Sequence, residues 1–294
     1  MRIIHVSDIH FWQYEFNPLR LLSKRLIGMA SLVSGRARRF RLEGVPRLVA
    51  QVRRLEPDHI LITGDLTTTA LPEEFRAARA ALADWLEDPD RVTIVPGNHD
   101  RYTLGAHRSR RFERYFGAFA PRVAFPWLRW LDPATAILGL DPTRAGVSAR
   151  GKLPASQLTE AQQMVAANPA RRLLIACHYP VAVPHDFRHE LARKPLINAG
   201  ELARWLQTLG PHVYCCGHIH AAWAFRPREL PDQLALNPGA PLLWGHAGHD
   251  PPGFLEVLLE GTAVSVRHHA WTGASWEVRP LHHNPAFFLA SPAP

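Results

Sequence analysis

The 294-residue chain contains only three cysteines, and it has no long run of apolar residues. Cys177, Cys215 and Cys216 lie in apolar stretches and three thiols cannot all pair, so we expect buried, reduced thiols and a reducing compartment. No stretch of about 18 uncharged apolar residues occurs, which excludes a membrane-spanning helix. Residues 1–10 lack the apolar region and the cleavage site of a signal peptide, so we expect a cytoplasmic protein.

The chain is also short of acidic residues: 26 Asp and Glu stand against 34 Lys and Arg, which gives a formal charge of +8. This excess favours contact with phosphates, nucleic acid or an anionic membrane. Nucleic acid is not the expected partner, because no separate nucleic-acid module is visible and the basic residues cluster in one segment. No protein partner is predicted.

Neither an internal repeat nor a linker-like segment divides the chain, so we expect one domain over residues 1–294 with a tail over 285–294. Amphipathic helical stretches, at 45–55, 72–87, 156–167 and 200–209, alternate with short apolar runs of the length of buried strands. This alternation predicts an α/β fold with a largely parallel sheet, followed by strands without helices after about residue 230. The predicted buried strands are 2–6, 59–63, 92–96, 136–141, 173–177 and 213–217.

Polar residues stand directly after the C-terminal ends of five of these strands. Ligands of open α/β sheets collect at the carboxyl ends of strands, and residues two apart in a strand point the same way, so we expect these groups to converge. Each motif alone has a plainer explanation as a turn or a surface pair, but five of them in order do not. The residues are Asp8, His10, Asp65, Asn98, His99, His178, His218 and His220.

Asp, Asn and neutral His form a mixed oxygen and nitrogen ligand set, which suits Mn, Fe or Zn better than Ca or Mg. The groups exceed what one ion takes, so we expect two ions, and Mn is favoured. Paired metals about 3.5–4 Å apart serve phosphoester hydrolysis. We therefore expect a metal-dependent phosphoric ester or pyrophosphate hydrolase. A non-catalytic metal-binding scaffold is the alternative, which a complete ligand set disfavours.

With these motifs the sequence resembles the calcineurin-like metallophosphoesterase superfamily, and NPG at 237–239 extends the resemblance. The resemblance implies a four-layer α/β/β/α sandwich with two metals at one sheet edge. A metal-bridging hydroxide would attack phosphorus in line, and His99 would stabilise the transition state or protonate the leaving oxygen. By the same resemblance, one metal takes Asp8, His10 and His220, the other takes Asn98, His178 and His218, and Asp65 bridges both.

Two positions depart from the family pattern. Many relatives carry an Asp three positions after the bridging Asp, which in some phosphatases orients the catalytic His, whereas this chain has Thr68. Tyr179 replaces the second His of the common HHPP stretch. The ligands survive both changes, but membership of the cyclic-nucleotide phosphodiesterase branch is weakened and the orientation of His99 is left open.

Residues 11–44 form a basic, amphipathic insertion behind the first two ligands. Asn17 and Pro18 predict a helix start and Gly35 predicts its end. A basic amphipathic helix fits an anionic membrane surface through residues 17–41; the alternative is a cap helix whose apolar face packs on the domain. The apolar face comprises Leu19, Leu22, Leu26, Met29, Ala30 and Val33, and Arg36, Arg38, Arg39 and Arg41 follow it.

This insertion and the stretch GDLTTT resemble, less specifically, the metallophosphoesterases that cleave UDP-diacylglucosamine in lipid A synthesis. A phosphorylated substrate is expected in either case: the favoured one is a UDP-linked diacyl glycolipid at the membrane surface, and the alternative is cyclic AMP in solution. Arg101 and His185 are candidate phosphate contacts. Three tryptophans are candidates for an acyl-chain pocket, although core tryptophans are commoner: Trp127, Trp130 and Trp223.

Overall fold

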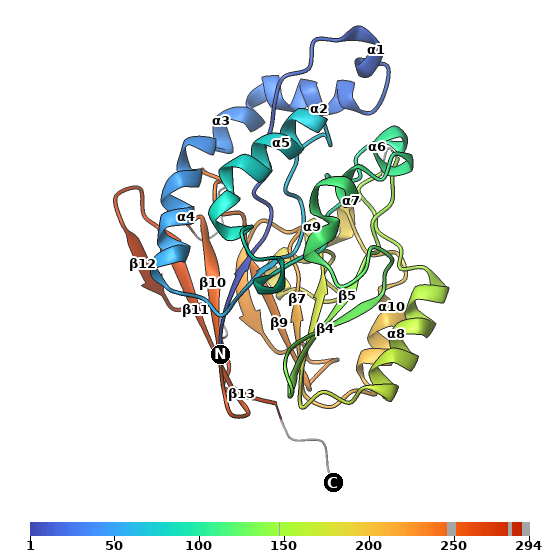
Figure 1. Ribbon diagram of the computed structural model, residues 1–294, viewed down its shortest axis with the longest axis vertical. Helices are drawn as coiled ribbons and strands as arrows, with labels where there is room; N and C mark the ends of the chain where they lie inside the picture. The colour runs from blue at the N-terminus through green and yellow to red at the C-terminus, as the bar shows by residue number, and fades with distance from the viewer. Residues whose placement is uncertain (147, 246–250, 282–283, 290–294) are drawn as a thin grey trace.

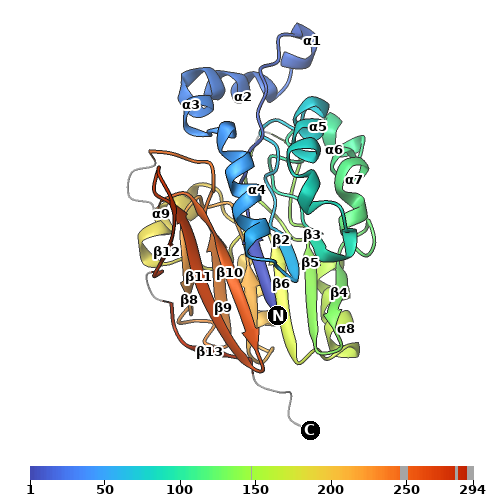
Figure 2. The ribbon, with the colours of Figure 1, turned by 60° about the vertical axis from the view of Figure 1, so that its left-hand side comes forward.

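The computed structural model describes residues 1–146, 148–245, 251–281 and 284–289. It contains a seven-stranded and a six-stranded sheet that pack face to face (Figures 1 and 2). The first sheet has the order β12-β11-β10-β1-β2-β3, with β13 paired to β11. Its strands are β1 (Arg2–Val6), β2 (His59–Ile62), β3 (Val92–Ile94), β10 (Gly253–Glu260), β11 (Ala263–Trp271), β12 (Trp276–Arg279) and β13 (Phe287–Phe288).

The second sheet has the order β4-β5-β6-β7-β9-β8. Both sheets combine parallel and antiparallel strands: β1, β2 and β3 are parallel to one another and β10 is antiparallel to β1, while β5, β6, β7 and β9 are parallel. The parallel strands match the short apolar runs, because such strands are covered on both faces. The strands are β4 (Trp127–Asp132), β5 (Thr135–Leu140), β6 (Arg172–Cys177), β7 (His212–Cys215), β8 (Ala222–Phe225) and β9 (Gln233–Pro238).

Helices cover the outer face of each sheet, which confirms the four-layer α/β/β/α sandwich. Side chains of β1 and β2 pack with α4 and α5 on one outside, side chains of β5 and β6 pack with α8 and α10 on the other, and a third core lies between the sheets. Among the described residues, none of the helices combines the length and apolarity needed to cross a bilayer. The helices outside the insertion are α4 (Val45–Arg54), α5 (Pro72–Ala81), α6 (Leu104–Arg108), α7 (Arg111–Phe116), α8 (Ala155–Ala167), α9 (Arg188–Arg193) and α10 (Ala199–Leu206).

The insertion is not the single helix that the sequence predicts. It forms α1 (Pro18–Leu21), α2 (Arg25–Ser31), a π-helical turn over Leu32–Arg36 and α3 (Ala37–Arg39), at one end of the molecule (Figure 1). Asn17 caps α1 as predicted, with its side chain accepting from Leu19 N at 2.9 Å. Gly35 has φ 124°, a left-handed conformation that suits glycine, and it turns the chain where the helix was expected to end.

Further stretches differ from the sequence-based expectation. The candidate acyl-pocket residues Trp127, Trp130 and Trp223 lie in the edge strands β4 and β8, which the sequence did not predict. The helix predicted over 72–87 ends at Ala81 and continues as a 3-10 turn, Ala83–Trp85. Within the expected tail, Phe287 is buried and pairs with Val264, whereas residues 290–294 lie outside the described residues.

Candidate metal centre

The predicted ligands come from both sheets and meet where the sheets face each other. Asp8 and His10 follow β1, Asp65 follows β2 and Asn98 follows β3, all in the first sheet. The second sheet contributes three histidines, because His178 follows β6, and His218 and His220 follow β7. The rule that ligands gather at carboxyl ends of strands therefore holds for two sheets at once.

One group of side chains surrounds Asp8. Its Oδ1 lies 3.3 Å from His220 Nε2 and 3.8 Å from His10 Nε2. The two histidine nitrogens lie 3.3 Å apart. The ligand atoms of Asp8, His10 and His220 all fall within 4.8 Å of one another, as a metal site requires.

A second group surrounds Asp65. Its Oδ2 lies 3.4 Å from His178 Nε2 and 3.7 Å from His10 Nε2, so this carboxylate reaches both groups. His218 Nδ1 lies 3.2 Å from His178 Nε2. The position between the two groups is the one that a bridging carboxylate must occupy.

The loops that carry these ligands hold an unusual backbone. Asp8, His10, Asp65 and His218 have φ between 52 and 71°, in the left-handed region. Such conformations cost about 1–3 kcal/mol each and concentrate at functional sites. The neighbouring Gly97 has no room for a side chain, because a Cβ there would collide with the Asp65 carboxylate.

The ring nitrogens of His178 and His218 and the side-chain oxygen of Asn98 are arranged to bind metal ions. His178 Nδ1 lies 2.7 Å from Thr63 O, and His218 Nε2 lies 2.8 Å from Lys194 O. A carbonyl only accepts, so these nitrogens carry the proton and the opposite nitrogen of each ring is left for a metal. Asn98 Oδ1 is buried and has no hydrogen-bond partner among the described residues, which is unusual unless a cation completes it.

The ionisation of the site also suits metal binding. Burial lowers the pKa of His10, His218 and His220, so these imidazoles are neutral, as ligands must be. Burial alone would raise the pKa of Asp65, but the surrounding histidines, His178 first, hold it well below its usual value. Burial alone would lower the pKa of His178, but the Asp65 carboxylate raises it to about 9. A metal ion that binds His178 therefore has to displace a proton from it.

His99 is oriented by the backbone rather than by an acidic side chain. Its Nδ1 donates to the carbonyl of Thr68 at 2.6 Å, and its ring stacks on Tyr102 with centroids 5.3 Å apart. Thr68 lacks the carboxylate that many relatives carry at this position, but its main-chain carbonyl still orients the His99 ring. Burial, followed by Arg36 and Lys24, lowers the pKa of His99 to about 3, against the pull of Asp65.

Two supporting residues were not singled out from the sequence. Asp100, directly after His99, accepts from Gly97 N and Thr67 N at 2.9 Å each and so ties the β2 and β3 loops together. Asn237 of NPG donates to Gly217 O at 2.7 Å and to Ile219 O at 3.0 Å, which braces the loop that carries His218 and His220. The available signal was their place in the sequence, next to the ligand Asn98 and inside NPG.

The two candidate phosphate contacts lie elsewhere. Arg101 is buried between two carboxylates, with Nη2 2.8 Å from Asp141 Oδ2 and Nη1 2.8 Å from Glu113 Oε1. His185 is exposed and lies on the wall of a separate surface hollow; its nearest described ion-pair partner is Asp186 at 3.7 Å. Neither joins the metal-ligand clusters, and their role as phosphate contacts stays a prediction.

Two of the three candidate acyl-pocket tryptophans are core residues. Trp127 is buried in the core between the sheets, and Trp223 is buried in the outer core of the second sheet, where it stacks on Phe187 at 5.4 Å. Trp130 is partly exposed on the edge strand β4. Trp127 and Trp223 serve packing, as buried tryptophans commonly do.

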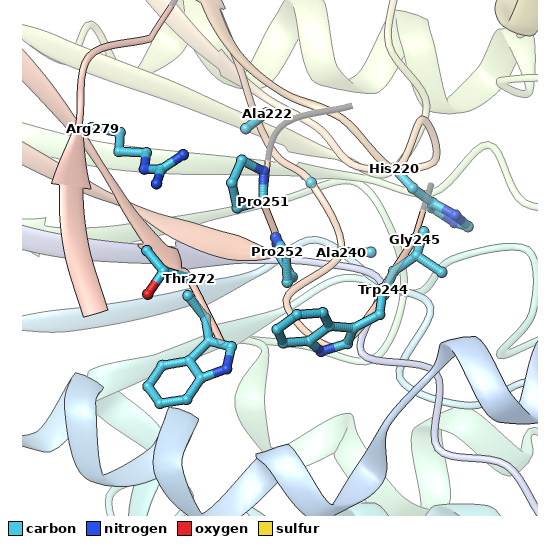
Figure 3. A pocket seen from close by; sticks show the side chains of 12 residues that line it. His220, Ala222, Ala240, Trp244, Gly245, Pro251, Pro252, Thr272 and Arg279 are labelled. Atoms are coloured by element: carbon cyan, nitrogen blue, oxygen red, sulfur yellow. The ribbon is translucent and has the colours of Figure 1, made fainter. Parts of the chain in front are cut away.

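A pocket of about 320 Å³ does open beside the metal centre, with His220 in its wall. Figure 3 shows Trp244 and Thr272 along one side, with Arg279 and His220 at separated points of the wall. Trp271 lines it as well. This size is at the lower end of the range, about 300–1,000 Å³, of small-molecule sites.

Comparison with known proteins agrees with this geometry. The family model described as calcineurin-like phosphoesterase matches residues 1–222. A probable glycerophosphodiester phosphodiesterase GpdQ of Arcobacter nitrofigilis is 27% identical over 170 residues, 56% of this chain and 57% of that protein. A glycerophosphodiester phosphodiesterase GpdQ of Enterobacter lignolyticus is 30% identical over 102 residues, 34% of this chain and 30% of that protein. The chain thus matches 57% of the length of the first relative and 30% of the length of the second.

Solved structures show the same fold at low sequence identity. A dimetal phosphatase from Danio rerio aligns with a TM-score of 0.61 at 13% identity, over 98% of this chain and 99% of that one. The purple acid phosphatase PPD1 of yellow lupin seeds aligns with a TM-score of 0.61 at 12% identity, over 94% and 52%. The chain therefore belongs to the calcineurin-like phosphoesterases, and its clustered side chains are the candidate ligands of a metal centre.

Proposed function

We propose that this hydrolase cleaves the pyrophosphate bond of a nucleotide-linked lipid, of the UDP-diacylglucosamine type, at an anionic membrane surface, with Mn as the preferred metal. The observation that carries the proposal is the insertion, which has exposed apolar side chains at its far end and contributes Arg36 to the metal centre at its near end. A membrane-bound lipid headgroup would meet both parts of such an element.

The lipid half of the proposal is supported by the exposure of the insertion. Of the predicted apolar face, Met29 is buried, with Leu32 and Ala37 in a small cluster of their own. The rest is turned to solvent, which is unusual for large aliphatic side chains that lie close together in sequence. Basic residues flank them, as in membrane-surface helices. The exposed fractions are Phe16 84%, Leu19 77%, Leu22 82%, Leu26 60%, Ile27 61% and Val33 71%.

The nucleotide half is supported by the pocket beside His220. Trp244 and Trp271 offer indole faces, and stacking of a base on an aromatic side chain is worth about 1–3 kcal/mol. Arg41 lies 4.8 Å from the ring centroid of Trp244 and Arg47 lies 4.5 Å from that of Trp271. The positive surroundings suit a ligand that carries phosphates.

The residues of the centre have separate tasks in this reaction. The two metal ions, when bound, supply positive charge to the phosphate oxygens and acidify a water molecule. Asp65 holds the two halves of the ligand set together. His99, whose Nδ1 donates to Thr68 O, presents Nε2 to the substrate, and once that nitrogen is protonated it can donate a hydrogen bond to the leaving oxygen.

A substrate comparison tests the proposal. The Mn-loaded protein is assayed on UDP-diacylglucosamine in mixed vesicles, on glycerophosphocholine, and on cyclic AMP. Release of UMP from the glycolipid at the highest kcat/KM is the expected result. No turnover of the glycolipid, with turnover of either soluble substrate, would contradict the nucleotide-lipid proposal while leaving the hydrolase intact.

The glycerophosphodiester is the second candidate, because both curated relatives are named for that activity. It shares the phosphodiester chemistry but needs neither a membrane contact nor a base-stacking pocket. Preference for glycerophosphocholine over the glycolipid would therefore favour it.

Vesicle binding tests the surface contact separately. Leu22→Glu with Ile27→Glu is expected to weaken binding to phosphatidylglycerol vesicles more than tenfold, because each buried aliphatic side chain contributes about 1.5–3 kcal/mol. Val278→Glu is the matched control, since Val278 is 59% exposed on β12, away from the insertion. Equal binding of the double variant and the control would reject the membrane contact.

A further inference from the structure

Arg36 stands apart from the other arginines of the insertion, because its side chain reaches the metal centre. Its Nη2 lies 3.3 Å from His10 Nδ1 and 3.2 Å from His10 Nε2, and its guanidinium lies 5.2 Å from the ring centroid of Phe40. Arg38 and Arg39, two and three positions on, are exposed. The sequence marks Arg36 only as one member of a basic cluster.

Apart from His10, the described residues offer the side-chain donors of Arg36 no acceptor. His10 Nδ1 lies 3.3 Å from Thr67 O and faces that carbonyl, and His10 Nε2 faces Asp8 and Asp65 as a metal ligand would. Both ring nitrogens are thus committed elsewhere. Arg36 Nε is buried without a hydrogen-bond partner, and Arg36 forms no ion pair with a carboxylate in the part of the chain that the structure describes. A buried cation in this state calls for an anion.

The position of Arg36 is fixed by the fold. Gly35 makes the left-handed turn directly before it, and Leu32 and Ala37 on either side are buried. The chain that follows is pinned to the 240–244 loop, since Phe40 pairs with Leu243 in an isolated bridge and Arg41 N donates to Leu242 O at 3.0 Å. These contacts therefore hold the Arg36 guanidinium beside the metal centre.

A second cation lies on the other side of the ligands. Lys194 is partly buried, and its Nζ donates to the carbonyl of His218. Arg36 and Lys194 thus flank the two ligand groups from opposite ends. Two metal ions already outweigh Asp8 and Asp65 in charge, so the extra cations suit a substrate with more than the single negative charge of a phosphodiester.

We infer that Arg36 is a substrate-binding residue that takes the second, non-scissile phosphate of a pyrophosphate-linked substrate. This inference rests on the proposed function and deepens it, because it assigns the preference for a pyrophosphate to a residue of the insertion. The planar fork of an arginine binds two phosphate oxygens at once, which a lysine cannot do.

Calorimetry with UMP and UDP tests the assignment, because the two ligands differ by one phosphate. The metal-loaded wild-type protein is expected to bind UDP about tenfold or more tighter than UMP. Arg36→Met is expected to reduce that ratio to below about threefold and to leave UMP binding unchanged. Arg36→Lys should keep an intermediate ratio, and it replaces the Met variant if that variant does not fold. Arg38→Met, an exposed neighbour, is the matched control and should behave as wild type.

The outcomes that contradict the role of Arg36 differ from those that contradict the proposed function. An unchanged UDP to UMP ratio in Arg36→Met, or an equal loss for both ligands, overturns the role of Arg36. If UMP itself does not bind, the nucleotide half of the proposed function fails, and the same ratio is then measured with pyrophosphate and phosphate. Hydrolysis of bis(p-nitrophenyl) phosphate by the wild-type protein shows independently that the centre is active.

Discussion

At the scale of single residues, Asp65 is the side chain on which the centre depends most. It reaches His10 in one ligand group and His178 in the other. Asp65→Ala is expected to lower the bound metal to one ion or fewer per chain. It should reduce hydrolysis of bis(p-nitrophenyl) phosphate by more than about 100-fold, the upper range for loss of a residue that only supports a ligand. Metal analysis and steady-state kinetics measure both effects.

A surface carboxylate provides the comparison for Asp65. Asp84 is half exposed and makes only a long contact of 3.7 Å with Arg53, so Asp84→Ala should retain metal and turnover. Normal turnover in Asp65→Ala would show that the two ligand groups do not work as one centre.

The orientation of His99 gives a second prediction at this scale. Because the acceptor for His99 Nδ1 is the carbonyl of Thr68, Thr68→Val should leave kcat within about threefold of wild type. The variant loses the bond from Thr68 Oγ1 to His10 O, 3.3 Å long, and about 1 kcal/mol of stability. His99→Gln should lower kcat by about 10²- to 10⁴-fold. Similar losses in both variants would mean that the Thr68 side chain, and not the carbonyl, positions the ring.

At the scale of elements, the start of α5 organises the loop that follows Asp65. Glu74 accepts from Thr69 N at 2.8 Å and from Leu71 N at 3.1 Å, and Arg25 of the insertion donates to Thr69 O at 3.2 Å. The insertion, the ligand loop and α5 therefore share one buried hydrogen-bond network. Burial raises the pKa of Glu74 to about 7, although these hydrogen bonds oppose the rise.

This pKa predicts a dependence of stability on pH. The folded protein holds the Glu74 proton up to about pH 7, whereas the unfolded chain releases it near the ordinary value of 4.5. The free energy of unfolding therefore falls as pH rises through this window, by about 1.4 kcal/mol per pH unit and on the order of 3 kcal/mol in all. Glu74→Gln keeps the shape and stays neutral, so it should gain stability over wild type between pH 5 and 7 in urea titrations. A difference that does not change with pH would contradict the assignment.

Elements also mark the limit of what the sequence reveals. The five ligand motifs were predictable because each follows an apolar strand, and strand ends meet in space. The course of the insertion was not, because its breaks at Leu22 and Gly35 depend on which apolar side chains find a partner. Arg36 reaches His10 only through that course, so its place could not be read from a basic cluster. Strands β4 and β8 were missed because aromatic, apolar stretches are common to strands and to ligand pockets.

At the scale of the whole molecule, metal binding should stabilise the fold. Asp8, Asp65 and the histidines around them are desolvated, and a metal that binds only the folded chain adds about 2.7 kcal/mol at 100 times its Kd. For a chain of this size that corresponds to a rise of roughly 5–10 °C in the melting temperature. Scanning calorimetry with Mn and with a chelator measures the rise. The Asp65→Ala protein should not show this rise. A wild-type melting temperature that is the same with Mn and with the chelator would argue against an assembled centre.

The division of the ligands between two sheets has a consequence for synthesis. A ribosome releases Asp8, His10, Asp65 and Asn98 with the first sheet's parallel strands, long before β6 and β7 deliver His178, His218 and His220. The antiparallel neighbour of β1, strand β10, emerges later still. Until β6 and β7 emerge, a nascent chain can therefore offer an ion only the ligands of the first sheet, and the complete centre arises after His220 and β10 are out. Metal capture is then the closing event of maturation, and a chain truncated before His220 should leave the ribosome without it.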